Sequence, residues 1–220
     1  MIHAVIFDLD QTLIDRDATF AAFIEAQYHR YRVNFEALSQ REYIETIQKF
    51  DNHGYTQKPE LYALVCQALQ LPDEMATTLC DDFFAHYGEM PIAVPHVHRV
   101  LKTLKTDYVL GVVTNGRSKA QRSKLTQAHL AGWFDSIRIS EEEGVKKPHS
   151  QIFEQCLHDL QVAAHHAVYV GDHPVNDIDA AKQIGMFAIW VDNGVYEPPR
   201  CCHGTITSLL ELPDEIRKVE

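Results

Sequence analysis

The chain contains 220 residues, of which 45% are hydrophobic, so it can bury a sizeable core as one large domain or two modest ones. Its net charge of −11 argues against a nucleic-acid backbone as the main partner, because such binding depends on Lys and Arg neutralising phosphates. No apolar run approaches the ~20 residues that span a bilayer, and the five scattered cysteines form no disulfide framework, so we expect no membrane partner and a cytoplasmic location.

The first predicted element is a buried strand that ends in two carboxylates. Val5, Ile6 and Phe7 form an almost continuous apolar run, which is typical of a parallel strand covered on both faces. Asp8 and Asp10 follow at the end of the strand, where parallel sheets bind their ligands. Two aspartates placed there would repel each other and remain poorly solvated unless a positive group lay between them. The arrangement therefore predicts a bound metal ion.

Between residues 15 and 90 the sequence predicts an α-helical insert with four helices and no strand. Ser39 and Glu42 have the spacing of a capping box that opens the second helix, Gly54 is expected to end it, and Pro72 to stop the third. Apolar residues recur at helical spacing along the insert: Phe20, Phe23, Ile24, Tyr28 and Tyr31; Tyr43, Ile44, Ile47 and Phe50; Leu61, Leu64, Val65, Ala68 and Leu69; Met75, Leu79 and Phe83. Its aromatic residues suit either a dimer face or internal packing, so the oligomeric state stays open.

From about Pro95 onward, helices and strands alternate. Helices are expected around Val97–Leu104, from Ser118, around Ile152–Leu160 and from Asp177 to Ile184, and strands at 109–113, 137–139, 167–170 and 187–191. With the first strand this makes five short strands, which favours an α/β fold: a Rossmann-like parallel sheet with helices on both faces. Residues 1–14 and 91–220 would form this core, with a last helix near Leu209–Pro213, and residues 15–90 would form a second domain.

Four motifs resemble the signature of one enzyme family. Residues 8–12, Asp-Leu-Asp-Gln-Thr, resemble the DxDxT motif of the haloacid dehalogenase-like (HAD) phosphohydrolases. Three more motifs follow in the family's order: Val-Val-Thr-Asn-Gly at 112–116, Lys-Lys-Pro at 146–148, and the stretch from Gly171 to Ile178. The place of the insert, after the first strand and before the second, is similar to that of the type 1 helical cap in this family.

The resemblance implies roles for three core residues. Asp8 would be the nucleophile that attacks phosphorus and forms an aspartyl-phosphate. Asp10 would protonate the leaving oxygen and later deprotonate the attacking water. Since the dehalogenase branch lacks an aspartate at this second position, Asp10 favours phosphate esters over carbon–halogen bonds. Lys147 would offset the negative charge of Asp8 and of the bound phosphate.

The resemblance also implies a Mg²⁺ cofactor. The side chains of Asp8 and Asp172 and the backbone carbonyl of Asp10 would bind the ion, because hard oxygen ligands suit it. Asp177 would orient a metal-bound water or Lys147. An alternative role for Asp177, as the N-cap of the following helix, is compatible with the first.

A phosphate-binding loop is implied after the second strand. Thr114, Asn115 and Gly116 would hold phosphoryl oxygens together with Lys147, and the amino terminus of the helix from Ser118 would add favourable potential.

Two further residues of the first motif, Gln11 and Thr12, would support the site without taking part in the chemistry. Thr12 would orient Asp10 or support the turn. Gln11 stands where many members of the family have Gly, which implies a more ordinary backbone angle or a polar contact with the cap.

These features predict a Mg²⁺-dependent, HAD-like phosphoric monoester hydrolase that acts on a small phosphorylated metabolite. Its helical cap would open to admit the substrate and close to exclude water. One alternative is a phosphomutase of the same family, which returns the phosphoryl group to its substrate. A second is a catalytically idle binding protein on this fold, whose mark would be the loss of Asp8, Asp10, Lys147 or Asp172; all four are present.

Overall fold

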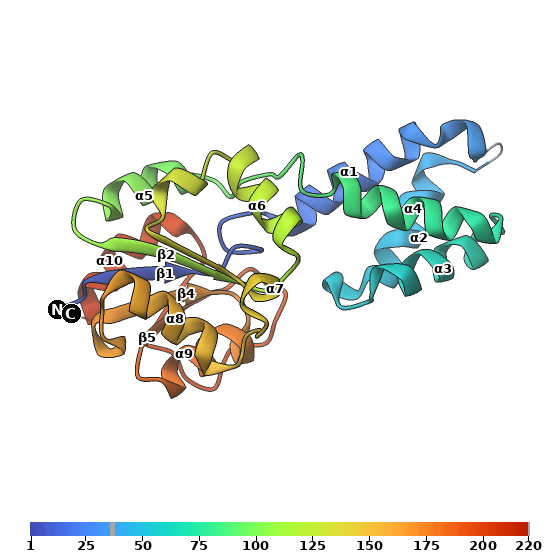
Figure 1. Ribbon diagram of the computed structural model, residues 1–220. Helices are drawn as coiled ribbons and strands as arrows, with labels where there is room; N and C mark the ends of the chain where they lie inside the picture. Colours follow the sequence, from blue (N-terminus) through green and yellow to red (C-terminus); the bar gives the residue numbers. More distant parts are fainter. Residues whose placement is uncertain (36–37, 220) are drawn as a thin grey trace. The chain divides into compact units, whose positions relative to one another are not determined.

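The computed structural model describes residues 1–35 and 38–219, which form two compact units (Figure 1). One unit comprises Met1–Asp15 and Pro91–Glu220, and the other comprises Arg16–Met90. Residues 36, 37 and 220, which fall within the predicted insert and core ranges, lie outside the described residues.

The first unit is built on a six-stranded parallel sheet. Its strands are β1 (Ala4–Phe7), β2 (Val109–Thr114), β3 (Ser136–Ile139), β4 (Ala167–Gly171), β5 (Phe187–Val191) and β6 (Gly204–Ile206), in the order β3-β2-β1-β4-β5-β6. Phe7 of β1 is in register with Val112 on one side and Val170 on the other. The strand order reverses at β1, so the carboxyl ends of β1, β2 and β4 meet where sheets of this kind bind their ligands.

Helices cover both faces of this sheet, which confirms the predicted Rossmann-like fold class (Figure 1). Val5 and Phe7 belong to the hydrophobic cluster on one face and Ala4 and Ile6 to that on the other, because successive side chains of a strand point in opposite directions. The first cluster includes α5 (Val97–Leu104), α6 (Ser118–Gln127) and α10 (Leu212–Val219), and the second includes α8 (Ser150–Leu160), η5 (Pro174–Asp179, a π-helix) and α9 (Ala180–Gln183). Shorter helices are η3 (Ala131–Trp133), α7 (Ser140–Glu143), η4 (Ala164–His166) and η6 (Leu209–Glu211).

Two details of the core differ from the sequence prediction. Strand β6 was not expected, because Gly204, Thr205 and Ile206 are too few to carry a strand pattern; it forms by pairing with β5. The helix expected from Asp177 begins at Pro174, because the His173 side chain accepts hydrogen bonds from two backbone N–H groups of the first turn.

The second unit is all-helical, as expected of the insert. Its helices are α1 (Arg16–Arg30), η1 (Arg32–Asn34), α2 (Gln40–Asp51), η2 (Asn52–Gly54), α3 (Lys58–Ala68) and α4 (Asp73–His86). The predicted capping box is confirmed at one of its two bonds, since Ser39 Oγ accepts a hydrogen bond of 3.2 Å from the backbone N–H of Glu42. Helix α2 ends before Gly54, because Asn52 and His53 already take left-handed conformations.

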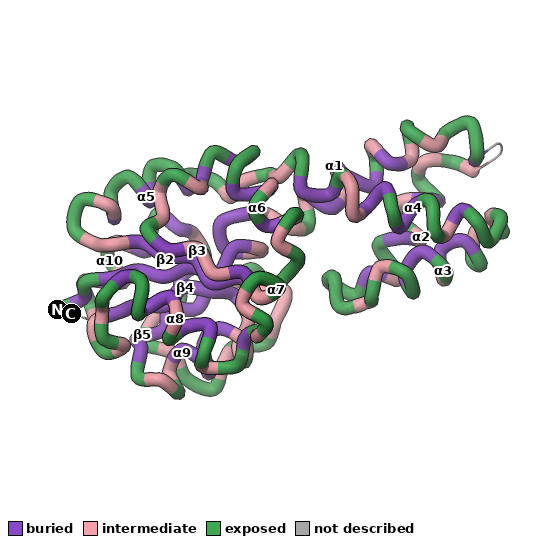
Figure 2. Tube along the Cα trace, in the orientation of Figure 1, coloured by how far each residue is buried: buried purple, intermediate pink, exposed green. Residues whose placement is uncertain are grey.

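Most residues of the predicted apolar stripes meet in one hydrophobic core within this unit, rich in aromatic side chains. Figure 2 shows the buried stretches along its helices. Ala68 is exposed, so its place in the third stripe was wrong.

A polar side chain, Gln27, is fully buried in this core and accepts hydrogen bonds from the hydroxyls of Tyr43 (2.8 Å) and Tyr62 (2.9 Å). Its amide group donates to Asp82 and to the carbonyl of Leu79. Gln27 thereby joins the four helices from the inside. No helix among residues 1–35 and 38–219 has the length and apolar character needed to cross a membrane.

Candidate active site

Three neighbouring strands deliver the candidate residues to one edge of the sheet. Asp8 follows β1, Thr114 ends β2, and Asp172 follows β4. The main chain of Asp8 stays attached to the sheet, since its N–H donates to the carbonyl of Val170 at 2.9 Å. Because parallel strands end on the same side, side chains that are more than a hundred residues apart in sequence come together here.

Lys147 lies at the centre of this edge and is almost fully buried. Its Nζ donates hydrogen bonds to Asp8 Oδ1 (2.5 Å), Asp177 Oδ1 (2.6 Å) and the hydroxyl of Tyr169 (2.9 Å). Burial works against the charged ammonium, but Asp177 and Asp8 outweigh it, so the pKa of Lys147 is raised above its ordinary value. Tyr169 in turn donates to the carbonyl of Val113. The ammonium is thus held in place by side chains from the end of β1, from β4 and from η5.

Asp8, Asp172 and Asp177 form a buried carboxylate cluster, with one oxygen from each within 4.8 Å of the others. Desolvation raises the pKa of Asp8 to about 7, since it outweighs the opposing effect of Lys147. Desolvation, followed by repulsion from Asp177 and Asp8, raises the pKa of Asp172 to about 8. Such crowding of acidic groups away from water is costly unless a cation compensates it. Oxygen-only donors of this kind fit a hard divalent cation such as Mg²⁺.

Neighbouring residues fix the direction of Asp172. Asn193 Nδ2 donates to its Oδ2 at 3.0 Å, and the indole N–H of Trp190 donates to its backbone carbonyl at 2.7 Å. Both donors come from β5 and the residues that follow it, so the sheet itself supports this carboxylate.

Asp177 is placed by the tight backbone of residues 171–173. Its Oδ2 accepts from the N–H of His173 at 3.0 Å, while Oδ1 contacts Lys147. A Cβ atom on Gly171 would lie 2.5 Å from Asp177 Oδ2, so only glycine leaves room for this carboxylate. The alternative role of Asp177 as a helix N-cap is wrong, because the helix begins three residues earlier with His173 as its cap.

Asp10 is held by two residues of α6 that sequence reasoning missed, Lys124 and Gln121. Lys124 Nζ donates to both carboxylate oxygens of Asp10, at 2.7 and 2.9 Å, and Gln121 Nε2 donates to Oδ2 at 2.9 Å. Their spacing of three residues places both on the inner face of α6, beside the buried Leu125. No local pattern marked them, because the sequence of α6 is mostly polar and a lysine on such a helix ordinarily faces solvent.

The charges of the whole edge indicate the charge of a cation that would fit there. In their ordinary ionised forms, four carboxylates and two ammonium groups leave two negative charges: Asp8, Asp10, Asp172 and Asp177 against Lys124 and Lys147. One divalent cation balances these charges before a substrate binds.

The loop after β2 already uses several of its polar groups within the protein. Thr114 Oγ1 accepts from Gln121 Nε2 at 2.7 Å. The side chain of Asn115 accepts from the N–H of Lys147 and donates to its carbonyl, which clamps the lysine loop. The N–H of Gly116 donates to Ser140 Oγ at 3.0 Å.

The amino terminus of α6 is capped by acidic residues of α7. The N–H of Ser118 donates to Glu141 Oε2 at 2.7 Å, and the hydroxyl of Ser118 bonds Glu142. These carboxylates offset the positive end of the helix dipole, so the predicted contribution of this terminus to phosphate binding is weakened.

Gln11 and Thr12 differ from what the motif implied. Gln11 takes a left-handed conformation (φ 63°), so the expected ordinary backbone angle is wrong; its N–H donates to the carbonyl of Ile14 at 2.7 Å, which holds the turn. Within the described residues the buried hydroxyl of Thr12 makes no hydrogen bond, which lends no support to an orienting role toward Asp10.

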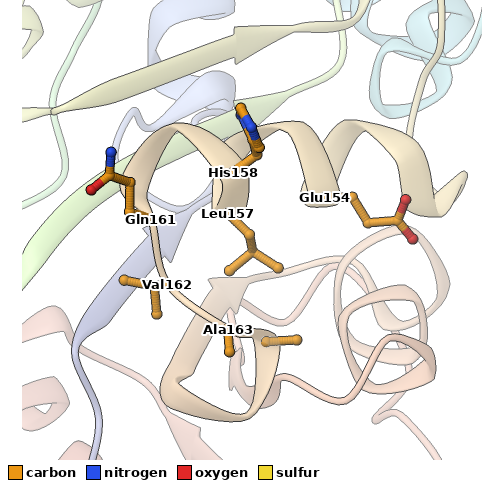
Figure 3. Close-up of a pocket in the computed structure, with 7 residues that line it drawn as sticks. Glu154, Leu157, His158, Gln161, Val162 and Ala163 are labelled. Carbon is orange, nitrogen blue, oxygen red and sulfur yellow. The ribbon is translucent and has the colours of Figure 1, made fainter.

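A surface depression of about 490 Å³ lies elsewhere on this unit, at the end of α8 and the turn that follows (Figure 3). Its lining residues include Glu154, Leu157, His158 and Gln161. None of the lining residues belongs to the carboxylate cluster, and we assign no chemistry to the depression.

Comparison with known proteins agrees with this geometry. The profile of the family described as haloacid dehalogenase-like hydrolase matches residues 5–191. The chain belongs to this family. It is 31% identical over 202 residues to the glyceraldehyde 3-phosphate phosphatase of Pyrococcus abyssi, covering 88% of this chain and 83% of that protein.

Other phosphatases resemble this HAD-like hydrolase to a similar degree. It is 30% identical to the ribulose-1,5-bisphosphate 5-phosphatase of Halopiger xanaduensis, over 87% of this chain and 85% of that one. The crystal structure of a HAD phosphatase from Thermococcus onnurineus superimposes with a TM-score of 0.68 at 25% identity, over 98% of each chain. The protein is therefore a hydrolase of the phosphatase branch, a phosphoric monoester hydrolase.

Proposed function

We propose that this HAD-like phosphatase is Mg²⁺-dependent and hydrolyses a small phosphorylated metabolite through an aspartyl-phosphate at Asp8. The observation that carries the proposal is the pairing of Asp8 with Lys147 beside Asp172 and Asp177, with a second carboxylate, Asp10, two residues along the chain.

Asp8 acts as the nucleophile in the first step. A carboxylate oxygen attacks phosphorus, a bond from Asp8 to phosphorus forms, and the bond from phosphorus to the ester oxygen breaks. Lys147 donates to Asp8 Oδ1 and favours its ionised, nucleophilic form. The same ammonium stabilises the negative charge that gathers at the phosphoryl group.

Asp10 moves the proton in both steps. It donates a proton to the leaving ester oxygen, and the ionised carboxylate then takes a proton from the water that attacks the aspartyl-phosphate. Free phosphate leaves, and Asp8 and Asp10 return to their starting states. The assignment fits the position of the Asp10 side chain, which is partly exposed and so open to substrate and water.

The buried carboxylates would hold the metal ion. The side chains of Asp8 and Asp172 and the carbonyl of Asp10 would bind Mg²⁺, which when bound neutralises charge that would otherwise repel the phosphate dianion. Asp177 orients Lys147 through their 2.6 Å contact and supports the ion from outside its ligand set.

Thr114, Asn115 and Gly116 would contact phosphoryl oxygens together with Lys147. Because the Asn115 side chain, the N–H of Gly116 and the Thr114 hydroxyl already have partners within the protein, the contribution of this loop would come mainly from its remaining backbone groups. Lys147 would supply the positive charge that attracts the phosphoryl group.

Residues 16–90 would act as a cap that admits small substrates and excludes water during the first step. The glyceraldehyde 3-phosphate and ribulose-1,5-bisphosphate phosphatases among the relatives support a small metabolite as the substrate. All five cysteines are free thiols, which supports a reducing compartment such as the cytoplasm.

The test measures phosphate release from a panel of small esters that includes glyceraldehyde 3-phosphate, ribulose 1,5-bisphosphate, phosphoserine and nucleoside monophosphates. Each ester is assayed with Mg²⁺ and with EDTA, using the native chain and Asp8→Asn. Asp214→Asn, at an exposed carboxylate of α10, is the matched control. Metal-dependent release by the native chain and the control, but not by Asp8→Asn, supports the proposal. An isomerised ester without free phosphate would indicate a mutase, and no turnover or phosphoenzyme with any ester would indicate a binding protein.

A further inference from the structure

Helix α6 carries a buried ion pair whose second partner is the carboxylate of Asp10. The Lys124 side chain is 3% exposed, whereas that of Asp10 is 27% exposed. The lysine therefore reaches its partner from inside the protein, and the carboxylate faces outward. Burying an ammonium is costly, and good hydrogen-bond geometry with a carboxylate offsets that cost.

Three hydrogen bonds fix both oxygens of Asp10. Lys124 Nζ donates to Oδ1 at 2.7 Å and to Oδ2 at 2.9 Å, and Gln121 Nε2 donates to Oδ2 at 2.9 Å. A carboxylate bound at both oxygens loses its freedom to rotate.

Gln121 also connects Asp10 with the loop after β2. Its Nε2 donates to Thr114 Oγ1 at 2.7 Å, and its Oε1 accepts from Lys124 Nζ at 2.9 Å. The amide is 2% exposed and has one orientation that satisfies both groups. Lys124, Asp10, Gln121 and Thr114 thus form one connected network.

Each of the two carboxylates of the first motif has its own ammonium group. Lys147 pairs with Asp8, and Lys124 pairs with Asp10. The two carboxylates therefore have different charged neighbours, so they can have different tasks.

We propose that Lys124 and Gln121 are positioning residues that hold the Asp10 carboxylate where it transfers protons to the leaving oxygen and from the attacking water. The inference rests on the proposed phosphatase function and deepens it. Proton transfer requires the carboxylate within hydrogen-bond reach of the reacting oxygen, and small displacements of a catalytic group reduce rates strongly.

Lys124→Met tests the inference, because methionine keeps an unbranched side chain of similar length and removes the ammonium. Two substrates are compared: the best alkyl phosphate of the panel, whose leaving oxygen needs a proton, and p-nitrophenyl phosphate, whose leaving group needs none. For the alkyl ester kcat should fall about 100-fold, with KM changed by no more than about twofold.

With p-nitrophenyl phosphate the first step should remain fast and the second should become slow. The variant should then show a burst of nitrophenolate and accumulate acid-stable, radiolabelled phosphoenzyme, because the hydrolysis of the aspartyl-phosphate still needs Asp10 as a base. Loss of a residue that only stabilised the fold would lower the fraction of active enzyme, and would produce neither the burst nor the phosphoenzyme.

Lys119→Met is the matched control, since Lys119 is an exposed lysine of the same helix. Gln121→Met provides a second variant should Lys124→Met fail to fold. It removes one bond to Asp10 and should lower kcat about tenfold, again with a burst and phosphoenzyme from p-nitrophenyl phosphate. The absence of both the nitrophenolate burst and the phosphoenzyme, or native kcat values in the folded variants, overturns the inference. If the native chain itself releases no phosphate, the proposed function fails instead.

Discussion

Replacing Lys147 by Met should destabilise the protein strongly, and more so as the pH rises. The substitution removes the ammonium from two buried carboxylates, Asp8 and Asp177. Removing one partner of a buried ion pair costs about 3–5 kcal/mol. We expect a loss of this size in the free energy of unfolding at pH 8 without metal.

The pH dependence follows from the raised pKa of Asp8. Burial holds this pKa at about 7 even with Lys147 present, so removing the lysine raises it further. The folded variant then retains a proton that the unfolded chain releases near pH 4. Stability therefore falls with rising pH, by about 1.4 kcal/mol per pH unit for each retained proton. The native chain has released this proton from Asp8 by pH 8. The difference in the free energy of unfolding between the variant and the native chain should therefore widen from pH 7 to pH 8.

Urea unfolding at pH 7 and pH 8 with EDTA, followed by circular dichroism, measures this difference. Lys146→Met, at the exposed neighbouring lysine, is the control and should unfold like the native chain. If Lys147→Met matches the native free energy of unfolding at pH 8, or if the difference is the same at both pH values, the reasoning about the buried pair is refuted. The variant should also lose phosphatase activity, because no other group replaces the charge beside Asp8.

Three further predictions concern the metal site and the helical unit. Gly171→Ala should weaken Mg²⁺ binding, measured by calorimetry, by about 10- to 100-fold, because its Cβ would displace Asp177, which supports the ion from outside its ligand set; unchanged affinity would contradict the tight fit. At one fixed Mg²⁺ concentration, the rise in Tm caused by the ion should be larger at pH 8 than at pH 6, because the raised pKa values of Asp8 and Asp172 mean that protons compete with the metal at the lower pH; Asp172→Asn should lessen this difference, and a larger rise at pH 6 would be inconsistent with it. Gln27→Leu should lower the stability of the helical unit by about 3 kcal/mol, because it removes the acceptor of two buried tyrosine hydroxyls and one of the donors to Asp82, which keeps Arg30 as a partner; a change below about 1 kcal/mol in the thermal unfolding of this unit would show that the network is readily replaced.

Local patterns in the sequence were enough to predict most elements of the fold. The apolar run before Asp8 specifies a strand buried on both faces, and the alternation after Pro95 specifies parallel strands joined by helices. The capping box at Ser39 fixed the start of α2 to the residue. These features were readable because each depends on neighbours within a few positions.

The tertiary structure decided which distant side chains meet. The sequence suggested that Asp8, Lys147 and Asp172 share a site, but their distances depend on the order of β1, β2 and β4 in the sheet. The partners of Asp10 were out of reach of local patterns, since Lys124 lies more than a hundred residues away and a lysine on an amphipathic helix ordinarily faces solvent. The left-handed backbone of Gln11 was equally out of reach. A residue with a side chain ordinarily avoids positive φ, but the hydrogen bonds of the turn hold Gln11 in this conformation. Local sequence therefore determines which segments form helices and strands. The partners of buried charges and the backbone of tight turns depend on which groups are buried together, and only the folded chain defines that.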